Sequence, residues 1–201
     1  MTSRQGRAYG RDELIDLLRV ALAELLADGA SFREVSVERL CGQAGVARST
    51  FYLQFEDKFV MLQALSAATL LRLYDAQRTW LAGGAEVSAH DVRRGMRKLF
   101  DAFAADEAVL RAVAEASAHS PAIRAAYHDA VADYARAIER FIRTGQAGGW
   151  VREVAAAPTS VALAWMTERT VSQVAPGASR RRMHVSADAL AEVFCATLIA
   201  G

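Results

Sequence analysis

The chain has 201 residues, a formal net charge of +1 and a hydrophobic share of 53%. This length allows one domain or two, and this share of apolar residues is enough to bury a sizeable core. The near-neutral charge is unlike the strongly basic balance of many nucleic-acid binders. No apolar run reaches the roughly 18 residues of a membrane-spanning helix, and residues 1–6 lack the apolar segment of a signal peptide.

The composition favours helix over sheet. Ala and Leu are abundant, and three prolines and 13 glycines leave long stretches without a helix breaker. Cys41 and Cys195 lie far apart, each within a predicted helix. That usage suits two small buried side chains in a reduced cytoplasm better than a disulfide. We therefore expect an all-α protein in the cytoplasm.

Apolar residues at helical spacing predict about nine helices. Asp57 is expected to cap the fourth helix, where a carboxylate suits the free N–H groups and the positive end of the helix dipole. Gly83-Gly84, a loop over Gly145–Gly149 and a basic loop over Arg180–Arg182 are predicted breaks. Two short helices are expected within residues 37–55. The other expected helices span about residues 11–28, 57–82, 89–105, 107–118, 121–144, 158–175 and 186–200.

Residues 37–58 have the pattern of a helix-turn-helix, in which the second helix can enter the major groove of DNA. Gly45 lies at the turn, where its backbone can adopt the left-handed conformation. Phe51 and Phe55 are four residues apart and share one helix face, which is expected to pack inward. The remaining polar side chains are candidates for base and phosphate contacts: Arg48, Ser49, Thr50, Tyr52 and Gln54. An ordinary polar helix face within a bundle is the alternative.

The segment from Ala44 to Tyr52, followed by Phe55 and Asp57-Lys58, resembles the TetR family of transcriptional regulators. The resemblance implies an N-terminal DNA-binding domain over residues 1–56 and a C-terminal ligand-binding and dimerisation domain over residues 57–201. It further implies that Tyr52 and Lys58 hold phosphates while the helix from about Arg48 to Gln54 reads bases.

The chain departs from the family pattern at three positions. Ala47 stands where a Ser or Thr cap is common, Gln54 stands where His is common, and Leu53 is an apolar residue at an exposed place. Leu53 is expected either to touch a thymine methyl group or to pack at the domain edge.

Charge does not by itself favour DNA binding. The first 58 residues contain eight basic and nine acidic side chains, a net charge of −1. Arg4, Arg7 and Arg11 cluster in an N-terminal arm that can follow a phosphate backbone or a minor groove, or can simply be solvated.

The second half resembles the branch of the family typified by the mycobacterial regulator of ethionamide resistance. The similarity lies in residues 162–170 and, more weakly, in the ending Ala200-Gly201. In that branch an apolar channel runs along the C-terminal bundle, and Thr167 stands here where the branch has Asn. The resemblance implies a small hydrophobic ligand, with plain core packing as the alternative for each lining residue. The implied lining residues are Val92, Leu99, Phe103, Tyr127, Tyr134, Thr167 and Phe194.

The last two predicted helices mix small and large residues suited to close helix packing. The family resemblance implies that they pair with their copies in a homodimer, which would bind a near-palindromic operator on double-stranded DNA. The residues expected in this packing are Val161, Ala162, Ala164, Trp165, Val171, Leu190, Val193, Phe194, Ala196 and Thr197.

Two other groups of polar residues have simpler interpretations. Glu168 and Arg169 sit in an otherwise apolar helix, where a structural ion pair is favoured over ligand recognition. His119, His128, Glu115 and Asp129 do not share one helix face, so surface residues are favoured over a metal site. No metal or cofactor is predicted.

These observations predict a repressor that a small apolar ligand releases from DNA by shifting the fourth helix. No nucleophile with its base and no metal-ligand spacing supports an enzyme. A helical adaptor that has kept the fold without operator binding is the alternative, and the near-neutral N-terminal region is its support.

Overall fold

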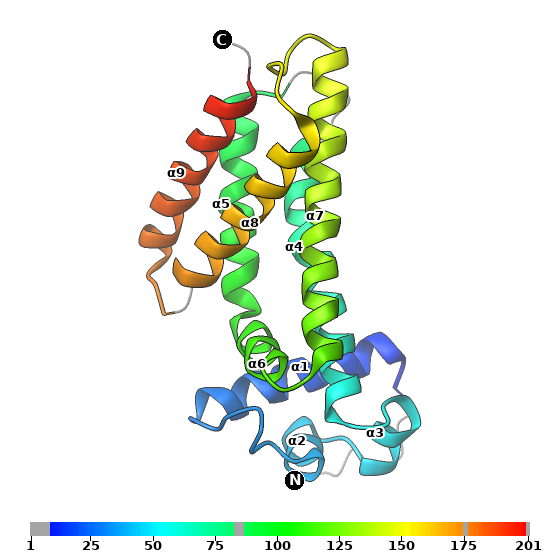
Figure 1. The fold of residues 1–201 in the computed structure, drawn as a ribbon. Coiled ribbons are helices and arrows are strands. Elements are labelled where there is room, and N and C mark those ends of the chain that lie inside the picture. The colour runs from blue at the N-terminus through cyan, green and yellow to red at the C-terminus, as the bar shows by residue number, and fades with distance from the viewer. Residues whose placement is uncertain (1–8, 83–86, 175–176, 200–201) are drawn as a thin grey trace. The chain divides into compact units, whose positions relative to one another are not determined.

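The computed structural model describes residues 9–82, 87–174 and 177–199, and these residues form nine helices (Figure 1). The expectation of an all-α fold is confirmed for the described residues, whose one β-type feature is an isolated antiparallel bridge between Val151 and Ile199. The helices are α1 (Arg11–Ala27), α2 (Val37–Ala44), α3 (Arg48–Gln54), α4 (Lys58–Leu81), α5 (Ala89–Ala105), α6 (Glu107–Ser117), α7 (Pro121–Ala147), α8 (Ala156–Val174) and α9 (Arg180–Leu198).

Short polar side chains set several helix starts. The Ser36 hydroxyl accepts the backbone N–H of Arg39 at the start of α2. Asp57 caps α4 as predicted, because its carboxylate accepts the N–H groups of Phe59 and Val60 at 2.7 and 2.8 Å. Each cap satisfies backbone donors that have no partner inside the helix, which fixes where the helix begins.

One predicted loop is wrong, and a second begins three residues later than predicted. Residues Arg180–Arg182 form the first turn of α9, because the Ser179 hydroxyl caps the helix and Arg is a good helix former. The three arginines therefore begin a helix, although their charge had indicated an exposed loop. Gly145 belongs to α7, where its missing side chain leaves room for Trp150 and Val151 to fold back on the helix end. The left-handed turn comes later, at Gly149.

The chain divides into two compact units. Unit 1 consists of residues 1–69 and 108–127, so α6 and the start of α7 join α1, α2, α3 and the first part of α4. Its core is a continuous cluster of leucines, phenylalanines and small apolar residues on α1, α2, α3, α4 and α6. The predicted division after residue 56 is one of function and stays a prediction, whereas these units are defined by packing.

Unit 2 consists of residues 70–107 and 128–201. Within it α5 lies beside α9, and α9 also contacts α8 (Figure 1). Trp80 is 1% exposed and packs in T-shaped arrangements against Phe141 and Phe194, with ring centroids 5.2 and 5.7 Å apart. The Trp80 indole N–H donates to the buried Gln77 amide, which donates in turn to the Gly95 carbonyl. Aromatic burial and a satisfied polar link thus tie α4 to α5.

Several sequence predictions fall on positions outside the described residues: the basic arm at Arg4 and Arg7, the break at Gly83-Gly84 and the ending Ala200-Gly201. Cys41 is buried as predicted, whereas Cys195 is only half-buried, and both thiols are free. Across the described ranges, no helix combines the length and apolar character that crossing a bilayer requires.

Candidate functional site

The turn between α2 and α3 has the predicted left-handed glycine. Gly45 adopts φ +66° and ψ 29°, and its N–H donates to the Gly42 carbonyl in the last turn of α2. Val46 donates back to the Cys41 carbonyl at 3.0 Å, which closes the corner. Three residues thus separate the end of α2 from the start of α3, as a helix-turn-helix requires.

The two phenylalanines of the motif fix the orientation of α3. Phe51 is 0% and Phe55 1% exposed, and their rings pack with centroids 5.4 Å apart. Because they anchor one side of α3 in the core, the other side faces outward. Of the predicted contact residues on that side, Thr50 is half-buried. The others are exposed: Arg48, Ser49, Tyr52 and Gln54.

Two details refine this outward face. Leu53 is 80% exposed, so packing at the domain edge is wrong for this structure and the contact with a thymine methyl group remains. The Arg48 guanidinium is 3.9 Å from the Glu38 carboxylate, with both side chains more than half exposed. An exposed pair at that distance is weak, so Arg48 is available to another acceptor. Ala47 caps α3 without a side-chain hydrogen bond, as its side chain predicts.

The structure gives Lys58 a different role from the predicted phosphate contact. Its ammonium donates to the carbonyls of Phe32, Arg33 and Val35 at 3.1, 2.8 and 3.0 Å. These bonds use all three of its N–H donors, so none is left for a phosphate in this arrangement. Burial lowers the pKa of Lys58 from its ordinary value, although the nearby Glu115 carboxylate acts in the opposite direction.

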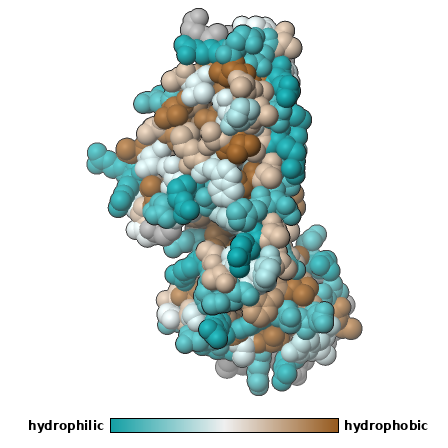
Figure 2. Space-filling model, viewed as in Figure 1, coloured by the Kyte–Doolittle hydropathy of each residue, from teal (hydrophilic) through white to brown (hydrophobic). Residues whose placement is uncertain are grey.

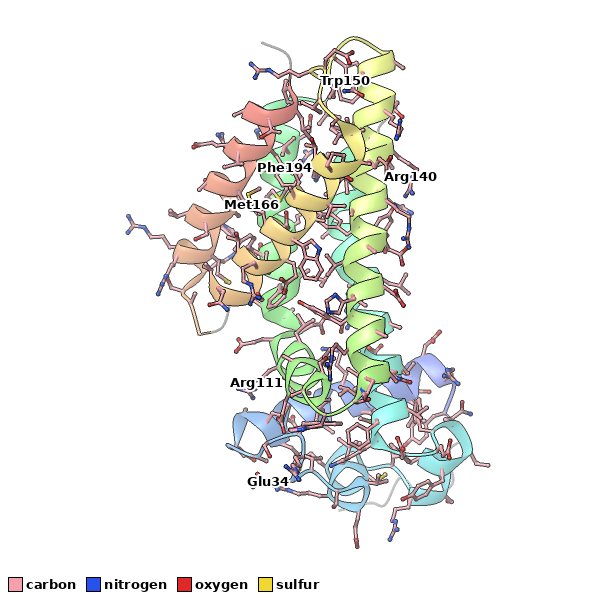
Figure 3. The ribbon with its side chains drawn as sticks, in the orientation of Figure 1. Glu34, Arg111, Arg140, Trp150, Met166 and Phe194 are labelled. Carbon is pink, nitrogen blue, oxygen red and sulfur yellow. The ribbon has the colours of Figure 1, made fainter. Side chains whose placement is uncertain are left out.

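Glu115 on α6 also holds this turn. Its two carboxylate oxygens accept the backbone N–H groups of Phe32 and Arg33 at 2.9 and 3.0 Å. Arg111, one turn earlier on α6, donates to the Leu26 carbonyl at 3.0 Å (Figure 3). We call Lys58 and Glu115, with the turn at residues 31–35, the α1–α2 turn clamp. It sets the approach to α2, and sequence reasoning missed it because Glu115 is more than 80 residues from its partners.

The predicted ligand-lining residues fall into different environments. Val92, Leu99, Thr167 and Phe194 are buried within unit 2, and Phe103 is half-buried. Phe194 points from α9 into the bundle (Figure 3), where its ring packs on Trp80. In this structure Phe194 therefore serves the aromatic core, and Trp80 is a neighbour that the sequence comparison did not identify.

Tyr134 and Thr167 are brought together from α7 and α8. The Tyr134 hydroxyl is buried, and its interaction with the Thr167 side chain falls short of hydrogen-bond geometry, so it has no fully formed hydrogen bond within the described part of the chain. Burial raises the pKa of the Tyr134 phenol, and the neighbouring Thr167 side chain opposes that rise only in part. Thr167 itself donates to the Leu163 carbonyl at 2.8 Å. A buried hydroxyl without a partner is costly, so it is available to a ligand acceptor.

Tyr127 belongs to the other unit. It is the last residue of unit 1 and packs against the core of that unit. The predicted pairing of Tyr127 and Tyr134 on one face of a pocket in the C-terminal domain therefore conflicts with the packing of Tyr127. The spacing of seven residues predicted that both rings lie on one side of α7. The Tyr127 ring, however, packs against the core of unit 1.

Part of the predicted dimer surface is exposed and part is not. Ala164, Val171, Leu190 and Phe194 are buried inside the subunit and face its own core. Figure 2 shows hydrophobic residues among paler ones over the face formed by α8 and α9. The exposed apolar side chains of this face are Val161, Ala162 and Trp165 on α8 and Val185, Val193 and Ala196 on α9.

The other polar groups have ordinary surroundings. Arg169 is exposed and Glu168 half-buried, so the premise that both charges are buried is wrong. His119, His128 and Asp129 are exposed, and Glu115 is engaged in the clamp. No three His, Cys, Asp or Glu side chains converge as metal ligands among the residues that the structure describes.

Known proteins share both this fold and the second half of the sequence. A TetR-family transcriptional regulator from Mesorhizobium loti, itself described as putative, superposes with a TM-score of 0.69 at 17% identity, over 96% of this chain and all of that chain. A transcriptional regulator from Saccharomonospora viridis, solved in complex with choline, gives a TM-score of 0.67 at 21% identity, over 95% of this chain and all of that chain.

In sequence, the transcriptional regulator EthR of Mycolicibacterium smegmatis is 30% identical over 118 residues. That match covers 59% of this chain and 54% of the relative, so the chain spans about half the length of the curated relative. The family model described as "Transcriptional regulator EthR, C-terminal domain" matches residues 92–200.

The fold is thus that of the TetR-type transcriptional regulators. Within that class, the chain belongs to the family defined by the EthR C-terminal domain. This confirms both resemblances read from the sequence. The family is one of transcriptional regulators, so the expectation that the chain is not an enzyme is also confirmed.

Proposed function

We propose that the protein is a sequence-specific DNA-binding transcriptional regulator that uses α3 as its recognition helix. The observation that carries the proposal is the fixed orientation of α3. Two buried phenylalanines and a left-handed glycine hold the helix at a sharp corner, and its exposed side consists of hydrogen-bonding residues. Such a helix can enter a major groove with its side chains on base edges.

The exposed residues have chemically distinct roles in this proposal. Arg48 and Gln54 pair with base edges, because a guanidinium suits guanine and an amide suits adenine. Ser49, Thr50 and Tyr52 contact phosphates through their hydroxyls. Lys58 acts indirectly, by holding the turn that leads into α2.

The exposed apolar face of α8 and α9, which is part of the predicted dimer surface, supports a homodimer. Trp165 is 37% and Val193 44% exposed, and both belong to an apolar face that would gain from burial against a second copy. A twofold dimer would present two copies of α3 to a near-palindromic operator.

The regulator is, in this proposal, a repressor that a small apolar ligand releases from the operator. The unpartnered Tyr134 hydroxyl beside Thr167 supports a ligand site in unit 2, as does the choline complex of the Saccharomonospora regulator. Helix α4 belongs to both units, so a ligand that shifts its second half also displaces Lys58 and the clamped turn. DNA binding then falls by a change in the population of states.

The test is fluorescence anisotropy with DNA from upstream of the coding region, over a series of salt concentrations. Arg48→Ala should relax base preference by about 1–3 kcal/mol, whereas Tyr52→Phe should weaken binding to all sequences. Arg140→Ala is the matched control, because this exposed arginine on α7 points away from the bundle (Figure 3). If Arg48→Ala and Tyr52→Phe both bind as the unaltered protein does, α3 is not the recognition helix. Binding no tighter than to random DNA, confirmed by a genomic selection, would favour the adaptor.

A further inference from the structure

A hollow of about 370 Å³ lies along the outward side of α5, away from the residues discussed so far. One side of α5 is buried in the core through Val92, Met96, Leu99 and Phe100. The opposite side of the helix is exposed. The hollow is open to solvent and is lined by residues of α5 alone, so it suits a charged group that binds at the surface. The residues that line the hollow are His90, Arg93, Arg94, Arg97, Lys98 and Asp101.

The charge of this region exceeds that of the whole protein. Helix α5 carries four Arg or Lys and two Asp, and α9 carries three Arg, one Asp and one Glu, so the two helices together have a net charge of +3. The whole chain has +1. The positive charge is therefore concentrated on one pair of neighbouring helices, and a cleft of one sign concentrates ions of the other.

Some of these cations are already neutralised. Arg97 forms two hydrogen bonds of 2.7 and 2.6 Å with the Asp188 carboxylate, and Arg94 bonds Asp91 at 2.8 Å. Asp101, the acidic residue of the lining, accepts from Arg180 and His184 of α9 at 3.0 and 2.9 Å. These contacts account for the acidic groups of the site, including the carboxylate that would otherwise repel an anion.

Two cations are less well matched, and one of them, Arg93, shares the Asp188 carboxylate with Arg97 through a looser ion pair. The Arg93 Nε is buried and lacks a hydrogen-bond acceptor in the described chain, and the nearest carboxylate oxygen, on Asp188, is 3.9 Å away. Lys98 is exposed, and no described residue forms an ion pair with it. Like charges three or four residues apart destabilise a helix. Asp91 and Asp188 offset this repulsion in part, but no described carboxylate forms an ion pair with Lys98.

We propose that the α5 hollow binds a phosphoryl group, with Arg93 and Lys98 as its principal donors and His90 and Arg94 at its edge. A guanidinium can donate two parallel hydrogen bonds to phosphate oxygens, and an ammonium supplies a compact charge beside it. The volume accommodates a phosphorylated metabolite or the headgroup of a phospholipid. The site uses other residues than the apolar site at Tyr134 and Thr167, and it requires no DNA binding.

Isothermal titration of the full chain with pyrophosphate, against sodium chloride of equal ionic strength, tests the proposal. We expect saturable binding of about one pyrophosphate per chain. The double substitution Arg93→Gln, Lys98→Gln should weaken it about tenfold or more, because it removes charge-assisted hydrogen bonds. Arg140→Gln, on α7, is the control for the loss of a surface charge and should change the affinity less than about twofold.

Three results would overturn the proposal: no saturable binding above the chloride reference, equal affinity in the double variant, or an equal loss in Arg140→Gln. Circular dichroism of each variant shows whether a loss of affinity is a loss of fold. Flotation with phosphatidylcholine vesicles, with and without phosphatidic acid, separates the two sources of the phosphoryl group. Vesicle binding that needs phosphatidic acid, Arg93 and Lys98 would support a lipid source, and its absence with intact pyrophosphate binding would support a free metabolite.

Discussion

Removing the Glu115 carboxylate is expected to loosen unit 1 without affecting unit 2. In Glu115→Ala, the N–H groups of Phe32 and Arg33 lose acceptors at 2.9 and 3.0 Å. Hydrogen bonds to charged groups contribute about 1.5–3 kcal/mol each. The Arg33 bond is exposed, so water replaces part of it, and the Phe32 bond is part-buried. We therefore expect unit 1 to lose about 2 kcal/mol, roughly a 30-fold change in its opening equilibrium.

The distribution of tryptophans makes this change measurable. The three tryptophans, Trp80, Trp150 and Trp165, all lie in unit 2, so their fluorescence reports that unit alone. Far-ultraviolet circular dichroism reports the helices of both units. In urea, the dichroism of Glu115→Ala should begin to fall at a lower concentration, while the fluorescence transition stays in place.

Amide hydrogen exchange locates the effect. The Phe32 and Arg33 amides should exchange faster in Glu115→Ala, and Glu56→Ala, an exposed acidic residue of the same unit, should leave them unchanged. Combining Glu115→Ala with Lys58→Met tests the clamp, because residues that act on one turn should show a non-additive effect. Unchanged exchange at both amides, together with an unchanged dichroism transition, would refute this account of the turn.

Three further predictions concern other parts of the chain. Gly45→Ala should destabilise unit 1 by about 1–2 kcal/mol in urea-induced unfolding, because φ +66° is strained for a residue with a Cβ. Gly95→Ala should destabilise unit 2 by about 1–3 kcal/mol and shift its tryptophan emission, because the added Cβ would overlap the buried Trp80 ring. Asp188, whose pKa is lowered mainly by its hydrogen bonds from Arg97, should stabilise the fold above its ordinary pKa near 3.8. The advantage over Asp188→Asn in thermal unfolding should therefore be constant at neutral pH and disappear as the pH falls below that value.

Each of these predictions has a matched comparison. Gly42→Ala, inside α2 with open space around the added Cβ, should be stabilising or neutral, in contrast to Gly45→Ala and Gly95→Ala. A destabilised Gly42→Ala would mean that backbone strain and overlap are not the causes. A difference between Asp188→Asn and the unaltered protein that persists at low pH would show that the carboxylate charge is not what stabilises α9.

The sequence by itself determined the local features of this protein. Helix periodicity, the Gly45 turn, the Asp57 cap and the inward side of α3 depend on residues a few positions apart, so their physical causes are visible in the chain. The same holds for the family, because the motif at residues 44–58 is contiguous. Even locally, the charge of Arg180–Arg182 obscured the stronger signal of the Ser179 cap.

Only the tertiary structure decided which groups meet across long separations. It brought Glu115 and Lys58 to the same turn, and it engaged all the donors of Lys58, which the motif had assigned to phosphate. It packed Phe194 on Trp80, and it gathered the cations of α5 beside α9. The reason is that spacing fixes which side of a helix a residue occupies, whereas the partner on that side depends on how distant helices pack.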